Sequence, residues 1–353
     1  MNFFYKDIAI TGLLVVLPEN ERDFVDDMKM FNFPESRSLK LKKVMGYDKH
    51  RIVQDNVCVS DLAVFGLKHL FNTGSLIKDD FDSLLVVTQS PDHFIPGTSS
   101  VIQGELDLKT DLLCMDITQG CAGYIVGLMQ AFMLLQQPSI NKVVLINGDV
   151  LSRKVSRHDR NSFPLIGDGL SITVIENKLD EKVYANIKMD GKGREALAIP
   201  AGGFRMPSDH QTAELKDVGD GNKRSKNHLK MDGAAVFNFV QSKVPDMISE
   251  LLEFSNTPYR EVDYFVFHQP NKFMLQKLAD KMGVPYEKMP NNIVEKFGNS
   301  SGVTIPIALA YNLKEELTNG KIKVCLAGFG VGLTWGSMYL NLGDFEFCEL
   351  IEY

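Results

Sequence analysis

Short β-rich runs alternate with helical patterns along most of this chain. In the first half the β-rich runs lie at residues 8–17, 83–87, 112–117, 142–146 and 171–176. Amphipathic stretches separate them, for example at 59–72 and 122–136. Such alternation is typical of a sheet with helices packed on its faces, because each apolar face has to be buried against another element. We therefore predict an α/β fold with a mixed sheet.

The alternation restarts after about residue 177, which indicates two related halves. The second half is expected to contain strands at 183–189, 264–268, 323–327 and 334–342, and helices at 234–252, 272–282 and 303–316. Two local pieces also recur, since the segments 120–123 and 299–302 each open an apolar helix and a Gly-rich turn entering a strand follows each one. We interpret them as traces of a duplication with halves 1–178 and 179–353, packed together because no linker-like segment separates them.

Charge and cysteine usage narrow the class of protein. A net charge of −7 over 353 residues argues against a general nucleic-acid binder, which presents a basic field. The five cysteines are scattered through apolar segments, which favours a reducing compartment over a disulfide framework. Neither a CxxC pair nor an HExxH motif is present, so we predict no zinc site, and we expect no other metal and no cofactor.

The apolar run at 8–17 does not have the pattern of a targeting signal. Asp7 stands where a signal peptide carries basic residues, Pro18 closes the run, and no small-residue cleavage site follows. The longest other apolar stretch, at 124–135, is too short to span a bilayer. We expect a cytoplasmic protein without a membrane span.

Cys121 is the first candidate for chemistry. It follows the β-rich run 112–117 through a short turn and stands at the start of an apolar helix pattern. A helix N-terminus presents unpaired N–H groups and the positive end of the helix dipole, so we expect the pKa of this thiol to fall below its usual ~8.5. Gly120 and Gly123 leave room for a substrate. The alternative for any single cysteine is a buried structural role, which Cys114 fits.

Two residues of the second half are further candidates. His268 ends the β-rich run 264–268, where side chains point into the ligand crevice of α/β folds, although alone it is equally well a core histidine. Asn299, within the segment 298–302, can also be a turn residue or a helix N-cap. Papain-like hydrolases share the order Cys, His, Asn, but their C-G-[SA]-C-[WY] signature is absent here.

Seven short motifs occur in a fixed order over nearly the whole chain. They are Ile10-Thr11-Gly12 with Leu17-Pro18-Glu19, the segment 116–124 around Cys121, Ile166-Gly167-Asp168-Gly169, Met231-Asp232-Gly233 with Val236-Phe237, His268-Gln269-Pro270-Asn271, Gly298-Asn299-Ser300-Ser301, and the segment 328–336. Together they resemble the motifs of the β-ketoacyl-acyl-carrier-protein synthase III family of the thiolase superfamily. Each motif is only moderately specific, but coincidence does not explain seven in register.

The resemblance implies a fold and a reaction. The family fold is a five-layered α-β-α-β-α duplication with two mixed sheets, usually assembled as a homodimer. In the family's reaction a cysteine thiolate takes an acyl group from a thioester donor. A malonyl thioester then loses CO2, and the resulting carbanion attacks the acyl-enzyme. The chain is thus expected to be a ketoacyl-synthase-III-like acyltransferase of fatty-acid biosynthesis.

The resemblance also implies roles for residues of this chain. Cys121 is expected to be the nucleophile. His268, as a neutral imidazole with a proton on Nε2, and Asn299 are expected to donate hydrogen bonds to the thioester oxygen that becomes an enolate. The backbone N–H groups of Cys121 and Val331 are expected to form the oxyanion hole, although the family usually has a glycine where Val331 stands. Phe329 occupies the position of the second catalytic cysteine of the thiolases, which disfavours thiolase chemistry.

Substrate and partner contacts are expected to differ in part from those of the family. We expect an acyl-CoA or acyl-carrier-protein donor, a malonyl thioester acceptor and an acyl carrier protein as partner. The usual carrier-docking Arg and Lys correspond here to Phe273 and Asn238, and the family's CoA-stacking Trp has no counterpart near residues 38–51. Ile95 replaces a phenylalanine that often reaches into the acyl pocket of the partner subunit. With Phe329, it is our candidate for the substrate pocket.

Two alternative functions stay open on the sequence. The same three residues can transfer an acyl group to an amine, alcohol or other nucleophile without forming a carbon–carbon bond. A non-catalytic partner subunit can also keep this fold for docking, although the intact set of Cys121, His268 and Asn299 argues against it. Detection of CO2 and a carbon–carbon-coupled product would separate condensation from simple transfer.

Overall fold

The computed structural model describes residues 1–353, and a nine-stranded mixed sheet is its largest feature. The strand order is β12-β13-β14-β7-β6-β4-β5, with β1 paired to β7 and to β15. The strands of this sheet are β1 (Asn2–Leu17), β4 (Ser83–Val87), β5 (Leu113–Ile117), β6 (Lys142–Asp149), β7 (Gly169–Met189), β12 (Tyr264–Phe267), β13 (Lys321–Gly330), β14 (Thr334–Gly343) and β15 (Phe347–Glu352).

The long strands β1 and β7 join the two expected sheets into one. The first part of β7 pairs with β6 and its last part pairs with β14, while β1 runs antiparallel beside both parts. The prediction of separate strands at 171–176 and 183–189 is therefore wrong. The polar residues between them stay extended because β1 pairs with β7 almost throughout, with register shifts between Lys6 and Ile8 and between Ile10 and Gly12. Residue 178, where we placed the boundary between the halves, lies inside β7.

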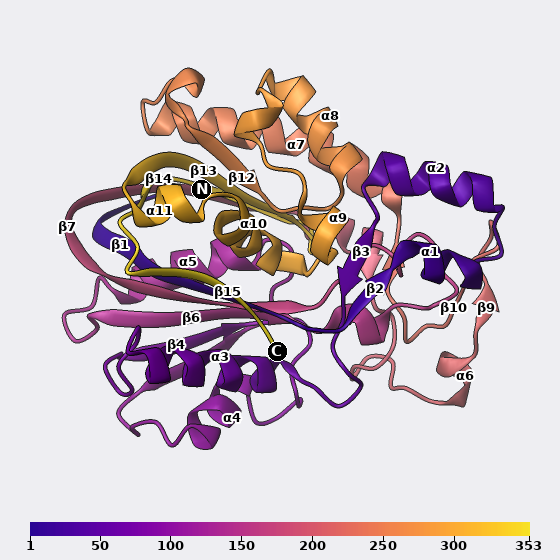
Figure 1. Cartoon of the computed structure of the whole chain (residues 1–353), viewed down its shortest axis with the longest axis horizontal. Helices are drawn as coiled ribbons and strands as arrows, with labels where there is room; N and C mark the ends of the chain where they lie inside the picture. Colours follow the sequence, from indigo (N-terminus) through magenta and orange to yellow (C-terminus); the bar gives the residue numbers. More distant parts are fainter.

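Helices form three layers around this sheet (Figure 1). The outer layers are α3 (Val59–Thr73) with α4 (Thr98–Glu105), and α7 (Gly233–Phe254) with α8 (Lys272–Met282). Between the two parts of the sheet lie α5 (Gly123–Leu134) and α10 (Thr304–Asn312). The largest apolar cluster, 39 buried residues, fills this central layer, and clusters of 23 and 22 residues lie under the two outer layers. The expected five-layered α-β-α-β-α architecture is confirmed.

Short elements form a lobe beside the layers, at the right of Figure 1. They are β2 (Glu21–Asp23), α1 (Phe24–Asp27), α2 (Glu35–Met45), β3 (Lys49–Arg51), α6 (His210–Ala213), β9 (Lys216–Asp217) and β10 (Lys223–Arg224). The other short elements are β8 (Leu197–Ala198), β11 (Lys230–Met231), α9 (Ile293–Phe297) and α11 (Lys314–Thr318). No helix combines the length and the apolar character that crossing a membrane requires.

Several strands end at the same place in the molecule. The parallel pair β12 and β13 delivers His268, whose N–H donates to the carbonyl of Ala327 at 2.7 Å. β5 leads through a short turn to Cys121, and β13 ends at Gly330 beside it. The carboxyl ends of strands are where open α/β sheets bind ligands, because the loops there are free to carry polar side chains. The candidate residues of the two halves therefore meet at one site.

Candidate active site

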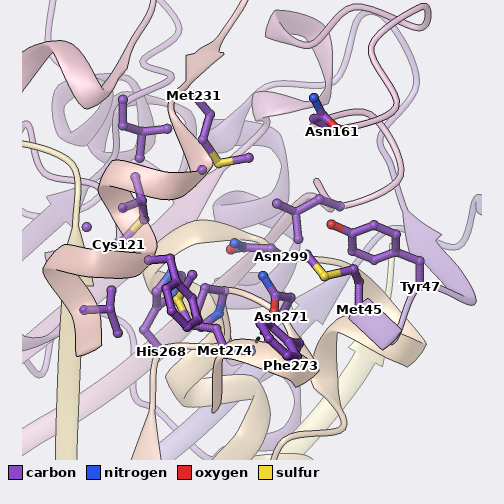
Figure 2. Close-up of a pocket in the computed structure, with 18 of the residues that line it drawn as sticks. Met45, Tyr47, Cys121, Asn161, Met231, His268, Asn271, Phe273, Met274 and Asn299 are labelled. Atoms are coloured by element: carbon purple, nitrogen blue, oxygen red, sulfur yellow. Dashed lines mark hydrogen bonds between the residues drawn. The ribbon is translucent and has the colours of Figure 1, made fainter. Parts of the chain in front are cut away.

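Cys121, His268 and Asn299 line one cavity of about 440 Å³ (Figure 2). Cys121 comes from the turn before α5, His268 from the end of β12, and Asn299 from the segment before the short 3₁₀ helix η6 (Ser301–Val303). Most of the 21 lining residues are hydrophobic. The structure thus brings together all three residues that the sequence singles out.

Cys121 stands just before helix α5 rather than in its first turn, since the helix begins at Gly123 with Ala122 as its N-cap. Burial raises the pKa of the Cys121 thiol. Hydrogen bonds from the Val331 N–H, the Ser301 side chain and the N–H of Cys121 itself lower this pKa, but they do not outweigh burial. The expectation of a lowered pKa is therefore wrong, because an apolar cavity solvates a thiolate poorly. At neutral pH the resting group is the thiol.

Two backbone donors meet at the sulfur of Cys121. The N–H groups of Cys121 and Val331, which the sequence proposes as the oxyanion hole, both lower the pKa of this thiol. Gly330 is required for the approach, because a Cβ there would lie 2.6 Å from the Cβ and 2.8 Å from the Sγ of Cys121. A peptide N–H does not depend on the side chain that follows it, so valine at 331 keeps this donor.

His268 is almost fully buried, and a hydrogen-bonded threonine fixes its ring. Its Nδ1 lies 2.8 Å from Oγ1 of Thr304. This hydroxyl accepts from the N–H of Gln269 at 3.0 Å and lies 3.0 Å from the carbonyl oxygen of Ser301. Burial lowers the pKa of His268 to about 4, so the imidazole is neutral at neutral pH. The ring of Phe329 meets the imidazole edge-on at 5.7 Å and lines the same cavity.

Asn299 is tied to the first half of the chain by its backbone and to the second half by its side chain. Its N–H donates to the carbonyl of Leu165 at 2.7 Å, and its own carbonyl accepts from the N–H of Gly167 at 3.1 Å. The side-chain Oδ1 accepts from the N–H of Ser301 at 2.9 Å. Because Oδ1 is occupied by this bond, the Nδ2 amide group is left to donate into the cavity.

Cys121 also lines a second cavity, of about 150 Å³. Ten of its 14 lining residues are hydrophobic, among them Leu151, Leu229 and Val331. Cys121 and Asn299 line both cavities, so the sulfur faces a larger and a smaller space.

Ile95, the other candidate for the substrate pocket, lines neither of these cavities. Its side chain is 87% exposed and lies at an open hollow of about 860 Å³. Within this single chain the structure therefore does not bring Ile95 and Phe329 together.

The polar residues near Cys121 were not predicted from the sequence. Gln89 follows β4 and Asp149 ends β6, and Gln89 Nε2 lies within 3.0 Å of Ser301 Oγ and 3.3 Å of Asp149 Oδ2. The available signal is that both polar residues come at the carboxyl ends of strands that pair in parallel. Thr304 was not predicted for a different reason. It lies about one helical turn beyond the asparagine motif, and so outside the segment that indicated a site.

Comparison with known proteins gives a consistent result. The family model for 3-oxoacyl-[acyl-carrier-protein (ACP)] synthase III matches residues 115–193, and the model for the C-terminal part of the same family matches 252–342. A relative from Campylobacter jejuni is 33% identical over 99% of this chain and 98% of its own length. A β-ketoacyl-[acyl-carrier-protein] synthase III of Streptococcus mutans is 33% identical over 83% of this chain and 88% of its own.

The solved structures agree with the sequence relatives. A crystal structure of a 3-oxoacyl-(acyl-carrier protein) synthase from Burkholderia xenovorans superposes with a TM-score of 0.92 at 31% identity. The match covers 100% of this chain and 99% of the other. The chain therefore belongs to the β-ketoacyl-acyl-carrier-protein synthase III family of acyl-transferring condensing enzymes.

Proposed function

We propose that this enzyme takes an acyl group from a thioester donor onto Cys121 and joins it to a malonyl thioester with loss of CO2. The placement of Cys121, His268 and Asn299 on one cavity carries this proposal. In the first step Sγ of Cys121 attacks the acyl carbonyl carbon. The oxyanion that forms takes the N–H bonds of Cys121 and Val331, and losing one such donor typically costs about 10²–10³-fold in rate.

His268 and Asn299 serve the second step. As the malonyl group loses CO2, its thioester oxygen becomes an enolate, and the Nε2–H of His268 and the Nδ2–H of Asn299 donate to that oxygen. A neutral imidazole suits this role because it donates without bringing a buried positive charge. The carbanion then attacks the acyl carbon on Cys121, and the ketoacyl product leaves through the larger cavity.

The two cavities divide the substrate between them. The cavity of about 440 Å³ accepts the arm that carries the thioester, and the cavity of about 150 Å³ accepts the acyl chain. An apolar cavity of about 150 Å³ holds a benzene-sized group of roughly six carbons. We therefore propose acyl groups of up to about six carbons as primers.

The carrier-docking surface we propose is centred on helix α2. Leu41 and Met45 of this helix line the larger cavity, while Arg37, Lys40 and Lys43 are exposed and form no salt bridge. Acyl carrier proteins are acidic, so three free cations on a helix that lines the cavity supply complementary charge. Phe273, which replaces a docking Arg, instead stacks on Phe237 at the cavity wall with ring centroids 5.8 Å apart.

We also propose a cytoplasmic homodimer. Phe94, Ile95 and Phe204 are 71%, 87% and 91% exposed, and the two phenylalanine rings lie 5.4 Å apart. Such an apolar patch is typical of a surface that another protein covers. A second copy seated there would bring Ile95 toward the neighbouring subunit, as its position in the family motif implies. Five cysteines that form no disulfide agree with a reducing compartment.

Mass analysis of the intact protein tests the first step. The protein is incubated with acetyl- to octanoyl-CoA and with the same acyl groups on a carrier protein. We expect a mass gain of one acyl group on the wild type and none on Cys121→Ala. If no donor labels Cys121, the proposed acyl-enzyme is wrong.

Release of CO2 from malonyl-carrier protein tests the second step. His268→Ala and Asn299→Ala should still become acylated but lose decarboxylation. Transfer of the acyl group to another nucleophile without condensation is not favoured, because that reaction needs neither of these two donors. Normal decarboxylation in either variant would refute the role assigned to it.

A further inference from the structure

Asp149 is a carboxyl group buried beside the nucleophile, and the steps above do not use it. Its side chain is fully buried. Oδ1 accepts from the N–H of Gln89 at 2.8 Å, from Ser90 Oγ at 3.0 Å and from Thr88 Oγ1 at 3.2 Å. None of these partners is a cation, and a buried carboxylate without one is costly in free energy. A group kept under these conditions calls for a functional explanation.

Hydrogen bonds through Gln89 link Asp149 to Ser301, which lies beside Cys121. Nε2 of Gln89 lies 3.3 Å from Oδ2 of Asp149 and 3.0 Å from Oγ of Ser301. Ser301 lines the smaller cavity together with Cys121, and its hydroxyl lowers the pKa of both Asp149 and Cys121. A hydroxyl has one proton and two lone pairs. Since Ser301 Oγ accepts from Gln89, it can donate to Asp149 while its remaining lone pair receives a proton from Cys121.

The backbone holds Ser301 in this position. Its φ of +60° lies in the left-handed region, which is uncommon for a residue with a side chain. Its N–H is bonded to Oδ1 of Asn299 at 2.9 Å, and its carbonyl oxygen lies 3.0 Å from Oγ1 of Thr304. Unusual backbone conformations persist when the surroundings fix them, and they are concentrated at functional sites. The Ser301 hydroxyl is thus fixed between the two acidic groups.

The thiol of Cys121 needs an acceptor for its proton. Two buried groups near it, His268 and Asp149, differ in how readily they take up a proton. Burial lowers the pKa of His268 to about 4, whereas burial raises the pKa of Asp149 to about 6 against hydrogen bonds from Gln89, Ser90 and Ser301. Asp149 therefore holds a proton more readily than His268 does.

The other surroundings of Asp149 carry no charge. The loop after β4 contributes Thr88, Gln89 and Ser90, and η6 contributes Ser301. Cys121 is the titratable neighbour, and the charge of Asp149 raises the pKa of its thiol. Two buried anions side by side oppose each other, so passing the proton from one group to the other avoids that state.

We propose that Asp149, acting through the Ser301 hydroxyl, accepts the proton of the Cys121 thiol during acyl transfer. This inference rests on the proposed acylation of Cys121. As Sγ forms its bond to the acyl carbon, the S–H proton moves to Oγ of Ser301 and the proton of Ser301 moves to Asp149. The bond from the acyl carbon to the donor sulfur then breaks, and the donor thiolate takes a proton from water at the cavity mouth.

Condensation returns the proton. The carbanion forms a carbon–carbon bond with the acyl carbon, and the bond from that carbon to Sγ breaks. The released thiolate of Cys121 takes a proton from Ser301, which takes one from Asp149. The charge of the buried cluster is the same before and after the cycle.

The pH dependence of single-turnover acylation tests the relay, with acetyl-CoA and hexanoyl-CoA as probes and mass analysis as readout. In the wild type the rate should be flat above about pH 6 and should fall below it, as Asp149 becomes protonated. Asp149→Asn should be about 100-fold slower at pH 7.5, within the usual contribution of general base catalysis, and its rate should rise tenfold per pH unit. Ser301→Ala, which leaves the carboxylate in place, should behave in the same way.

Two control variants locate the effect. Ser90→Ala removes a hydrogen bond to the same carboxyl group away from Cys121 and should keep the wild-type profile shape. His268→Ala should also keep the fall near pH 6. The relay is refuted if Asp149→Asn or Ser301→Ala keeps the wild-type rate and profile, or if the fall disappears in His268→Ala. Should Asp149→Asn not fold, Ser301→Ala decides. A wild type that is never acylated contradicts the proposed function, not the relay alone.

Discussion

Replacing Thr304 by valine should move the proton of His268 from Nε2 to Nδ1 and so separate decarboxylation from acylation. For Nε2–H to face the substrate, Nδ1 must accept a hydrogen bond, and the Thr304 hydroxyl, with Oγ1 at 2.8 Å, can give it by turning its proton away from the Ser301 carbonyl at 3.0 Å. Valine has the same shape but no hydroxyl. The backbone carbonyl of Ser301 also acts on the imidazole, and a carbonyl only accepts. Nδ1 therefore takes the proton, and Nε2 no longer donates.

The size of the effect follows from the two hydrogen bonds that change. The Nε2–H tautomer loses its bond from Thr304, and the Nδ1–H tautomer gains one to the Ser301 carbonyl. At about 0.5–1.5 kcal/mol for each bond, the tautomer balance shifts by about 1–3 kcal/mol. The fraction of His268 that can donate, and with it the decarboxylation rate, should fall roughly 5- to 150-fold. Acylation of Cys121 does not use this donor and should change less than about threefold.

Two measurements check this prediction. The first compares CO2 release from malonyl-carrier protein with acylation of Cys121 by mass, because a general loss of folding would reduce both. The second is ¹⁵N NMR of histidine-labelled protein, which distinguishes protonated from unprotonated ring nitrogens. The His268 signals are assigned by their absence in His268→Ala.

Thr304→Ser is the matched control, because it keeps the hydroxyl and should restore the Nε2–H tautomer and most of the decarboxylation. The reasoning is refuted if Thr304→Val decarboxylates at the wild-type rate. It is equally refuted if the ¹⁵N spectrum shows the same tautomer in wild type and valine variant.

Three further outcomes are expected. Gly330→Ala places a Cβ 2.8 Å from Sγ of Cys121 and should slow acylation at least tenfold. Gly320→Ala, which has open space around it, should leave the acylation rate unchanged, and equal acylation rates in the two variants would contradict the packing argument. Lys40→Glu with Lys43→Glu should raise the KM for a carrier-bound donor about tenfold and leave an uncharged short thioester unaffected, with Lys314→Glu as control. Burial raises the pKa of Asp149 from 3.8 to about 6, so the stability that the protonated carboxyl group gives the wild type is present below pH 3.8 and is lost as the pH rises through 6. Relative to wild type, Asp149→Asn should therefore gain about 3 kcal/mol of unfolding free energy between pH 4 and 7 in urea titrations. If the difference in unfolding free energy between the two proteins does not change with pH, the pKa shift is contradicted.

Local sequence patterns were sufficient to predict much of the fold and the three central residues. Helix α8 begins and ends at the predicted residues, because Asn271 caps its N-terminus and Gly283 ends it in the left-handed conformation. Cys121, His268 and Asn299 each follow a run whose period and turn residues indicate where an element ends. Such signals depend on neighbours in the chain, so they can be interpreted without tertiary structure.

The parts that were not predicted depend on contacts between distant segments. The meeting of Gln89 with Ser301 depends on how two halves of the chain pack, and no local pattern contains that information. The prediction of a lowered pKa for the Cys121 thiol was wrong for a similar reason, because the burial that raises this pKa comes from segments far from Cys121 in sequence. The sequence predicted two strands where the structure has the continuous strand β7, because the polar middle of β7 is stabilised by pairing with β1 rather than by its own composition.

Ser301 connects the two half-reactions, and its backbone and side chain do so separately. Its N–H orients the amide of Asn299, and its carbonyl oxygen lies against Thr304, so the backbone supports the donors of decarboxylation. Its hydroxyl accepts from Gln89 and lowers the pKa of both Asp149 and Cys121, so in the proposed relay the side chain supports acylation. Removing only the hydroxyl should therefore impair acyl transfer while the geometry for decarboxylation survives. The positive φ is what allows one residue to present its peptide groups to one step and its side chain to the other.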